Sequence, residues 1–328
     1  MTNGPVIPGD FPVIPSGAKE SLSHDIADYP AGIVIPIDKP YRWTSADVIR
    51  KVKFAAFRHF RKKNLKVGHA GTLDPLATGV LLVCIGPACK RAQEFQDHDK
   101  EYVAGIRFGA TTPSYDLEKE VDRTFPFDHV TEDAVRAVLP SFLGTQEQVA
   151  PLFSAKSVDG VRAYEMARKM YRNAQKGITD PDFDAAALET LHHSTITINE
   201  LELLDFSTAP SASLEMTEGA SASGVGQNFF DLFSGEKVLV RGGTEDAQTS
   251  NTASSRIHVT DTSGMGLPEA HIRIACSKGT YIRAFARDLG EALGTGAHLS
   301  SLVRTRTGEF SLQEALTMEQ VLSLLSDA

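Results

Sequence analysis

The sequence predicts an α+β fold built around a mixed, largely antiparallel central sheet. Segments with strand and helix patterns follow one another without the strict strand–helix–strand alternation of a parallel α/β sheet. Of the 328 residues, 41% are hydrophobic and 23% are charged. This composition suits a globular chain with a substantial core and excludes disorder throughout.

The composition also excludes several classes of protein. The longest apolar run, Val80–Ile85, is far shorter than the ~20 residues that a membrane-spanning helix needs. The three cysteines, Cys84, Cys89 and Cys276, are too few for a disulfide framework and lack the C-x-x-C spacing of zinc sites. We therefore expect a cytoplasmic protein without a membrane segment.

The N-terminal segments predict a tail, a strand and a basic helix. Residues 1–30, which are rich in Pro, Gly and Ser, form the expected tail. β-branched residues between positions 32 and 38 predict a strand that ends at a proline turn. Either Thr44 or Ser45 can cap the next helix. Its apolar residues recur at helical spacing and are Val48, Ile49, Val52 and Ala56.

The next segments predict two strands and two helices. Residues 61–78 are loop-like, and the apolar run 80–85 predicts a buried strand. Alternate residues from 100 to 109 are apolar, which predicts a strand with one inward face. Helices are predicted next at 131–142 and 161–175.

The C-terminal half contains an expected insertion between ordered segments. An alternating strand, 192–206, precedes residues 207–268, which are acidic and rich in Ser, Thr, Gly and Ala and predict a mobile insertion. Order returns with an alternating strand at 271–276. Three elements complete the prediction: a helix capped by Thr280, a strand at 299–310 and a short helix at 317–325.

Charge is distributed unevenly along the chain. Residues 177–270 contain 15 acidic and 3 basic side chains, whereas the segment from Arg50 to Lys66 contains eight basic side chains and no acidic one. A polyanion could dock on this basic run although the whole chain carries a net charge of −9. Its candidate contact residues are Arg50, Lys62 and Lys63, and a solvated helix face is the alternative interpretation.

A glycine-rich loop surrounds a single carboxylate. Residues 67–79 contain three glycines, one proline and Asp74 immediately before the predicted buried strand. Glycines let a backbone or a ligand approach closely, so this loop can hold Asp74 rigidly at the entrance to a strand. An ionised carboxylate there can act as a nucleophile, a base or the partner of a cation. A turn aspartate bonded to its own backbone is the alternative.

Two other segments can carry chemistry. In residues 276–290, a strand, a turn and a helix bring Lys278 and Arg283 to the N-terminal end of the helix. Backbone N–H groups and cations at such an end suit a phosphate or a carboxylate. At the start of the strand at 100–109, the aromatic ring of Tyr102 lies close to a cation, and packing of this ring in the core is the alternative.

The glycine-rich segment has a recognisable sequence. Residues 68–81, Gly-His-Ala-Gly-Thr-Leu-Asp-Pro-Leu-Ala-Thr-Gly-Val-Leu, closely resemble the catalytic motif of the bacterial TruB-type pseudouridine synthases, which isomerise uridine-55 in the T loop of tRNA. Further segments resemble this family in the same order, so that the similarity spans about residues 31–206 and 270–316. These segments are 38–45, 100–102, 115–121, 148–160, 276–283 and 296–306.

The resemblance implies a pseudouridine-synthase-like domain in which an RNA-binding cleft crosses the mixed sheet. Asp74 resembles the aspartate that attacks the target nucleoside, at either uracil C6 or ribose C1′. Arg283 resembles the arginine that pairs with this aspartate, and a guanidinium in that place keeps a carboxylate ionised.

The resemblance also implies how the target base is held. A uridine inside a folded loop must be flipped out at a cost of a few kcal/mol, and stacking on Tyr102 could return roughly 1–3 kcal/mol. His69 would occupy the space that the base leaves. Tyr281 and Leu302 resemble pocket residues, and Lys39 resembles a lysine that supports the site.

Cofactors, partners and domain limits follow from the same resemblance. The isomerisation is internally balanced, so no metal, nucleotide or redox cofactor is expected. The expected partner is tRNA, bound through its T stem-loop by a monomer without a guide RNA. The catalytic domain would span residues 31–316, with the insertion at 207–268 away from the RNA, and residues 317–328 would add a short helix in place of a PUA domain.

Three alternatives remain open at this point. The first is a non-catalytic tRNA-binding or tRNA-folding chaperone that uses the same cleft; Asp74 argues against it, because binding of a polyanion gains nothing from a carboxylate. The second is the guide-RNA-dependent branch of the family, against which Leu76 and Ala77 favour the stand-alone bacterial type. The third is a hydrolase, but glycosidases usually employ two carboxylates.

Overall fold

A computed structural model describes residues 22–151, 157–158, 161–162, 193–208 and 257–326. These residues belong to two compact units, each assembled from separate stretches of the sequence. Unit 1 comprises Met1–Tyr102, Ser211–Ile257 and Leu302–Ala328, and unit 2 comprises Val103–Pro210 and His258–Ser301. Helices accompany strands that pair mostly antiparallel, which confirms the predicted α+β class.

Unit 1 is organised around the apolar strand β3 (Ala77–Ile85). β1 (Ile33–Lys39) pairs with one edge of β3 in antiparallel register. The other edge is shared by β2 (Val67–Ala70), which is antiparallel to β3, and by β12 (Ala297–Thr307), which is parallel to it. β3 is buried along its apolar run because it is covered on both faces, as such continuous runs require. β13 (Phe310–Ser311) extends the sheet by pairing with β12.

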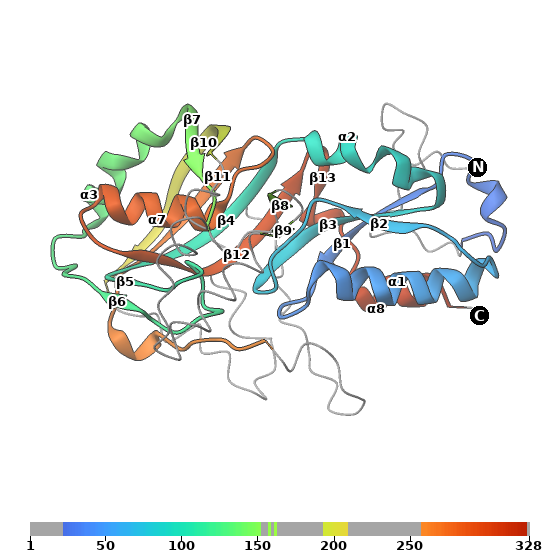
Figure 1. Ribbon diagram of the computed structural model, residues 1–328, viewed down its shortest axis with the longest axis horizontal. Helices are drawn as coiled ribbons and strands as arrows, with labels where there is room; N and C mark the ends of the chain where they lie inside the picture. Colours follow the sequence, from blue (N-terminus) through green and yellow to red (C-terminus); the bar gives the residue numbers. More distant parts are fainter. Residues whose placement is uncertain (1–21, 152–156, 159–160, 163–192, 209–256, 327–328) are drawn as a thin grey trace. The chain divides into compact units, whose positions relative to one another are not determined.

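Three α-helices accompany these strands in the described part of unit 1. α1 (Ser45–Phe60) and α8 (Met318–Leu324) contact each other and lie side by side in Figure 1. Each starts at a threonine N-cap with a capping box, Thr44 for α1 and Thr317 for α8. Of the two caps that the sequence offered for α1, Thr44 or Ser45, the structure uses Thr44. α2 (Ala92–Asp97) contributes the buried ring of Phe95 to the apolar cluster on β3.

The described part of unit 2 contains a second group of strands with two α-helices. β4 (Lys100–Phe108), of which all but the first three residues belong to this unit, is followed in the sheet by β11 (Glu269–Cys276), β10 (His193–Ser207) and β7 (Gly144–Val149). The helices are α3 (Glu132–Val138) and α7 (Ile282–Ala292). Two small antiparallel pairs complete the unit: β5 (Ala110–Thr111) with β6 (Arg123–Thr124), and β8 (Ser157–Val158) with β9 (Val161–Arg162).

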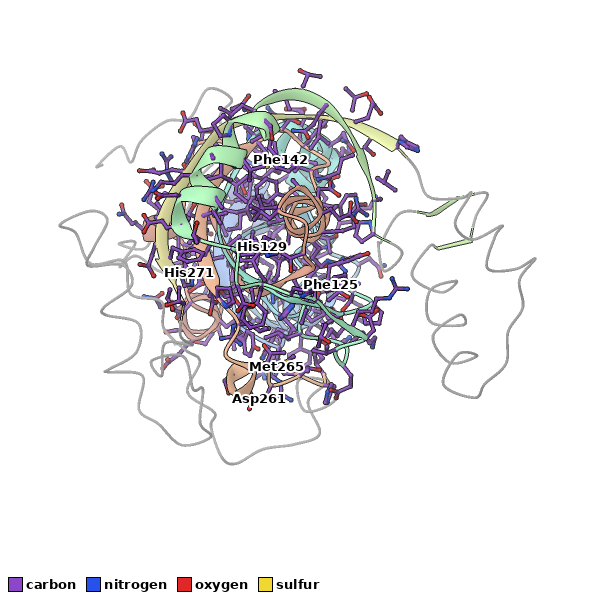
Figure 2. All side chains as sticks on the ribbon, turned by 90° about the vertical axis from the view of Figure 1, so that its left-hand side faces the viewer. Phe125, His129, Phe142, Asp261, Met265 and His271 are labelled. Atoms are coloured by element: carbon purple, nitrogen blue, oxygen red, sulfur yellow. The ribbon has the colours of Figure 1, made fainter. Side chains whose placement is uncertain are left out.

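Aromatic and polar contacts fix α7 within unit 2. The ring of Phe142 meets that of Phe285 edge-on at 5.4 Å between centroids, and Nε2 of His129 lies 2.9 Å from the carbonyl oxygen of Leu293. Phe142 and His129 are labelled in Figure 2, together with other residues of this unit. These contacts hold α7, which carries Arg283, in a defined place within unit 2.

Several predicted elements are confirmed, and others are wrong in detail. The strands predicted at 32–38, 100–109, 192–206 and 271–276 are β1, β4, β10 and β11. The predicted loop 61–78 instead contains β2, which forms because β3 offers a free edge. The predicted strand 299–310 is interrupted at Gly308, whose φ of +56° makes the turn between β12 and β13.

Three further predictions concern helices and the insertion. Thr280 does not cap α7: its Oγ1 donates to the carbonyl of Ser277 at 3.0 Å, and Tyr281 occupies the N-cap position. The helix predicted at 161–175 begins wrongly, because Val161–Arg162 is strand β9; its remainder lies outside the described residues. Of the predicted insertion, 209–256 lies outside them too, while the described end contains the buried residues Thr260, Thr262 and Leu267.

The described helices can also be compared with membrane spans. None of the helices among the described residues combines the length and the apolar character that would carry it across a membrane.

Candidate active site

The loop between β2 and β3 carries Asp74, and side chains from other elements of unit 1 bind its backbone. Ser45, the first residue of α1, donates from Oγ to the carbonyl of Leu73 (3.1 Å) and accepts from the Leu73 N–H (3.0 Å). Lys39, at the end of β1, donates from Nζ to the carbonyl of Pro75 (3.2 Å). The residues before and after Asp74 are therefore each tied to a separate element.

Arg304 of β12 supplies a third anchor for the loop that carries Asp74. Its side chain is buried, with 1% of its surface exposed. Nη2 donates to the carbonyl of Gly71 at 3.1 Å, and Nε donates to the carbonyl of Val80 at 2.7 Å. Gly79 is opposite Arg304 in the parallel register and has a φ of +96°; a Cβ at Gly79 would collide with the Arg304 backbone. The close approach of the two strands thus depends on glycine.

Asp74 itself is half-buried within this frame. Its backbone carbonyl accepts a hydrogen bond from the Ala77 N–H at 3.1 Å, which closes the turn into β3. Leu302, a predicted pocket residue, pairs with Ala77 in the register of β12 and β3. The structure therefore places Leu302 and Lys39 beside the loop that carries Asp74, as a shared site requires.

Lys39 is a cation in a fully buried position. Besides Pro75, its Nζ donates to the carbonyls of Pro40 (2.9 Å) and Trp43 (2.5 Å). Burial lowers the pKa of Lys39 to about 7, and the negative charge of Asp74 opposes this shift. Lys39 therefore combines a structural role, through three carbonyls, with a charge close to the candidate nucleophile that is positive below about pH 7.

Replacing Lys39 by methionine should flatten the dependence of stability on pH. The pKa of folded Lys39, about 7, lies below that of an unfolded lysine, about 10.4. Between these values the unfolded chain binds more protons than the folded chain, so wild-type stability rises with pH. From pH 7 to pH 9 this rise amounts to about 2 kcal/mol. Urea unfolding of both proteins at pH 7, 8 and 9 measures this rise. If the free energy of unfolding depended on pH equally in the two proteins, the lowered pKa of Lys39 would be contradicted.

The other predicted residues of unit 1 lie on three elements. Tyr102, the third residue of β4, is buried. His69 lies on β2 opposite Val83, and burial together with the charge of Arg304 lowers the pKa of its imidazole, which favours the neutral form at pH 7. Arg50 lies on α1, and its Nη1 is 2.7 Å from Oδ1 of Asp47. Of the basic run after α1, Lys62 and Lys63 are exposed.

In unit 2, Arg283 is held by Ser114 and Asp116, which the sequence analysis did not name as site residues. Its Nη1 donates to the carbonyl of Ser114 at 3.2 Å, and its Nε lies 3.8 Å from Oδ2 of Asp116. Asp116 is itself fixed, since its Oδ1 accepts from Ser114 Oγ (2.6 Å) and from the Glu118 N–H (2.9 Å). The available signal was a carboxylate inside the family-like segment 115–121.

Tyr281 is positioned by a second residue that the sequence analysis passed over. Gln148 of β7 donates from Nε2 to the Tyr281 carbonyl (3.1 Å) and accepts at Oε1 from the Tyr281 N–H (2.8 Å). This paired contact fixes the backbone of Tyr281, two residues before Arg283. Lys278, in the turn after β11, is exposed. The pairing of Arg283 with Asp74, which belongs to unit 1, stays a prediction.

Among the described residues, no group of three or more His, Cys, Asp or Glu side chains is arranged to hold a metal ion.

Comparison with known proteins identifies the family. A family model described as the N-terminal domain of TruB family pseudouridylate synthases matches residues 58–221, and one described as the C-terminal domain of tRNA pseudouridylate synthase B matches residues 283–327. A tRNA pseudouridine synthase B from Phocaeicola vulgatus is 40% identical over 292 residues, which cover 89% of this chain and 92% of the relative. The chain belongs to the TruB family. The predicted family and enzyme class, a pseudouridine synthase, are thereby confirmed.

More distant proteins are similar as well. A tRNA pseudouridine synthase B from Flavobacterium johnsoniae is 34% identical over 290 residues, covering 88% of this chain and 94% of the relative. Among solved structures, a chain of a Cbf5-Nop10-Gar1 complex aligns with a TM-score of 0.49 and 23% sequence identity. That alignment covers 89% of this chain and 54% of the other.

Proposed function

We propose that this TruB-family enzyme isomerises uridine-55 in the T loop of tRNA, with Asp74 as the nucleophile. The observation that carries the proposal is the anchoring of the Asp74 loop by Ser45, Lys39 and Arg304. The substrate is supported by relatives named tRNA pseudouridine synthase B, such as the one from Phocaeicola vulgatus. We further propose that residues 31–316 form the catalytic domain, and that the enzyme works as a cytoplasmic monomer without a guide RNA.

The proposed reaction is balanced within the nucleoside. The target uridine flips out of the T loop, and the Asp74 carboxylate attacks either C6 of its uracil or C1′ of its ribose. The C1′–N1 bond breaks, the uracil turns, and a C5–C1′ bond forms in its place. The bond from Asp74 to C6 or C1′ breaks as well, which regenerates the free carboxylate. C5 loses its proton and N1 gains one, so no oxidant, reductant or water is consumed. In this scheme Tyr102 stacks on the flipped uracil.

A fixed loop suits this chemistry. An attacking carboxylate is effective only when it is held close to the reacting carbon and in line with it, and a displacement of about 1 Å can cost about 10²-fold in rate. The three anchors restrict the backbone on both sides of Asp74, while the side chain remains half-buried and not sealed in the core. Arg283 is the proposed cation that keeps Asp74 ionised, and Tyr281 and Leu302 are proposed to line the base pocket.

Tritium release tests the reaction and the position together. The purified enzyme, with no other RNA added, is incubated with a tRNA transcript that carries tritium at C5 of its uridines. We expect stoichiometric release from this transcript and none from a transcript with cytidine at position 55. Release that persists with cytidine at 55 would contradict the proposed position. Absence of release from both transcripts would contradict the proposed activity on tRNA.

A further inference from the structure

α1 presents a row of exposed arginine and phenylalanine side chains that the proposed chemistry does not use. Each of these residues has another member of the row three or four positions away along the helix and its C-cap, which places them on one side of it. The opposite side of α1 is core, since Val48, Val52 and Ala56 are fully buried. We refer to the row as the α1 stripe; it consists of Arg50, Phe54, Phe57, Arg58 and Arg61.

The two aromatic rings of the α1 stripe are exposed to an unusual degree. Phe54 has 65% of its surface exposed and Phe57 has 41%. In the described part of the chain, only Leu143 and Met265 are other large hydrophobic residues with comparable exposure, and both belong to unit 2. The two neighbouring rings therefore form an exposed apolar patch on one face of α1. Exposed apolar patches of this kind mark sites of interaction.

The surroundings of these rings are strongly positive. The guanidinium of Arg58 lies over the ring of Phe54, 5.9 Å from its centroid. No Asp or Glu occurs between Val48 and Leu73 in the sequence. The carboxylate next to this segment, that of Asp47, pairs with Arg50, whose own side chain is largely exposed. Exposed lysines flank the α1 stripe at positions 51, 53, 62 and 63. The surface thus selects for a partner that is negatively charged and carries flat apolar groups.

RNA has this combination of groups. Its phosphates meet arginine and lysine side chains, and its unpaired bases stack on phenylalanine rings and on guanidinium planes. We propose that the α1 stripe binds the substrate RNA outside the target nucleotide, with Phe54 and Phe57 stacking on unpaired bases and the arginines contacting phosphates. This inference rests on the proposed function, because it takes the RNA substrate as the occupant.

The position of the α1 stripe explains why it would contact a part of the RNA away from the target. α1 starts at Ser45, which binds the loop that carries Asp74. With a rise of 1.5 Å per residue, Phe54 lies about 14 Å and Arg61 about 24 Å along the helix axis from Ser45. α1 therefore joins the candidate nucleophile to a surface that can hold a neighbouring segment of the same RNA.

Binding measurements with matched variants test this inference. The variants are the double substitution Phe54→Ala/Phe57→Ala and the charge reversal Arg58→Glu. The control is Lys90→Glu, which makes the same type of charge reversal at an exposed site of unit 1 outside the α1 stripe. The affinity for a full-length tRNA transcript is measured by filter binding at several salt concentrations, and tritium release is measured in single turnover at saturating tRNA.

Each variant has a distinct expected result. The double phenylalanine variant should bind tRNA at least about tenfold more weakly, because each of two stacked bases contributes about 1–3 kcal/mol and 1.4 kcal/mol corresponds to tenfold. Arg58→Glu should reduce the slope of log affinity against log salt by about 0.7–0.9, the amount for one lost phosphate contact. The control should change neither value to this extent. Single-turnover release at saturating tRNA should stay within about twofold of wild type, since the reacting groups are untouched.

Two results would overturn the inference. The first is an unchanged tRNA affinity in the double phenylalanine variant. The second is a wild-type protein that light scattering shows to be a dimer, together with a double phenylalanine variant that is a monomer. The α1 stripe would then bind a second copy of the chain and not RNA. A failure of the proposed function is separable from both: wild-type protein would then release no tritium, while its tRNA affinity would still depend on Phe54 and Phe57.

Discussion

Replacement of Asp74 by asparagine should lower tritium release from tRNA by at least about 10⁴-fold, as the loss of a catalytic nucleophile does in other enzymes. The amide has almost the shape of the carboxylate but cannot form the covalent bond to uracil or ribose. The backbone anchors at Leu73 and Pro75 do not involve the Asp74 side chain, so the loop should keep its place. Filter binding should show an affinity for tRNA within about threefold of wild type, because no phosphate contact is removed.

Asp38→Asn is the matched control for this prediction. Asp38 is also a carboxylate of unit 1, and its Oδ1 accepts from the Gly79 N–H at 3.1 Å, a bond that asparagine can keep. Burial raises the pKa of Asp38, so removal of its charge is tolerated more easily. We expect this control to retain activity within about tenfold. Equal tritium release from wild type and Asp74→Asn would exclude Asp74 from the mechanism.

Local patterns predicted the features of this protein that depend on neighbouring residues in the sequence. The helical spacing of apolar residues and the capping threonine Thr44 located α1, because both act within a few residues. The glycine-rich segment predicted, for the same reason, that Asp74 stands in a loop at the entrance to a buried strand, and it lies before β3; its role as nucleophile stays a prediction. β2 was missed because Val67-Gly-His-Ala has neither alternation nor β-branched enrichment, and it is a strand because the edge of β3 provides its hydrogen bonds.

Residues that act through distant contacts could not be predicted in this way. Arg304 and Arg306 stand two positions apart in one strand, and nothing in their local sequence distinguishes them. Only the parallel pairing of β12 with β3 brings Arg304 to the carbonyl of Val80, 224 residues away in the chain. Asp116 and Gln148 were missed for the same reason, since their partners, Arg283 and Tyr281, are more than 100 residues distant.

The second large effect is expected on replacing Arg304 by methionine. The carbonyl of Val80 would lose its Arg304 donor in a buried place and that of Gly71 in a partly buried one, and an unsatisfied buried group costs about 1–3 kcal/mol. Methionine fills much of the space, so the loss is mainly one of hydrogen bonds. We expect the free energy of unfolding, measured with urea, to fall by about 3 kcal/mol. The rate of tritium release should fall about 10²-fold, because the Asp74 loop loses one of its anchors.

Two further variants separate positioning from general damage. Arg306→Met changes the neighbouring arginine, which is half-exposed and 3.5 Å from Glu101, and should alter stability by less than about 0.5 kcal/mol. Arg304→Lys keeps the charge, but one ammonium cannot serve both the Val80 and the Gly71 carbonyl as the forked guanidinium does. It should therefore recover part of the stability and leave the reaction slow. If Arg304→Met were destabilised but reacted at the wild-type rate, Arg304 would support the fold of unit 1 without positioning Asp74.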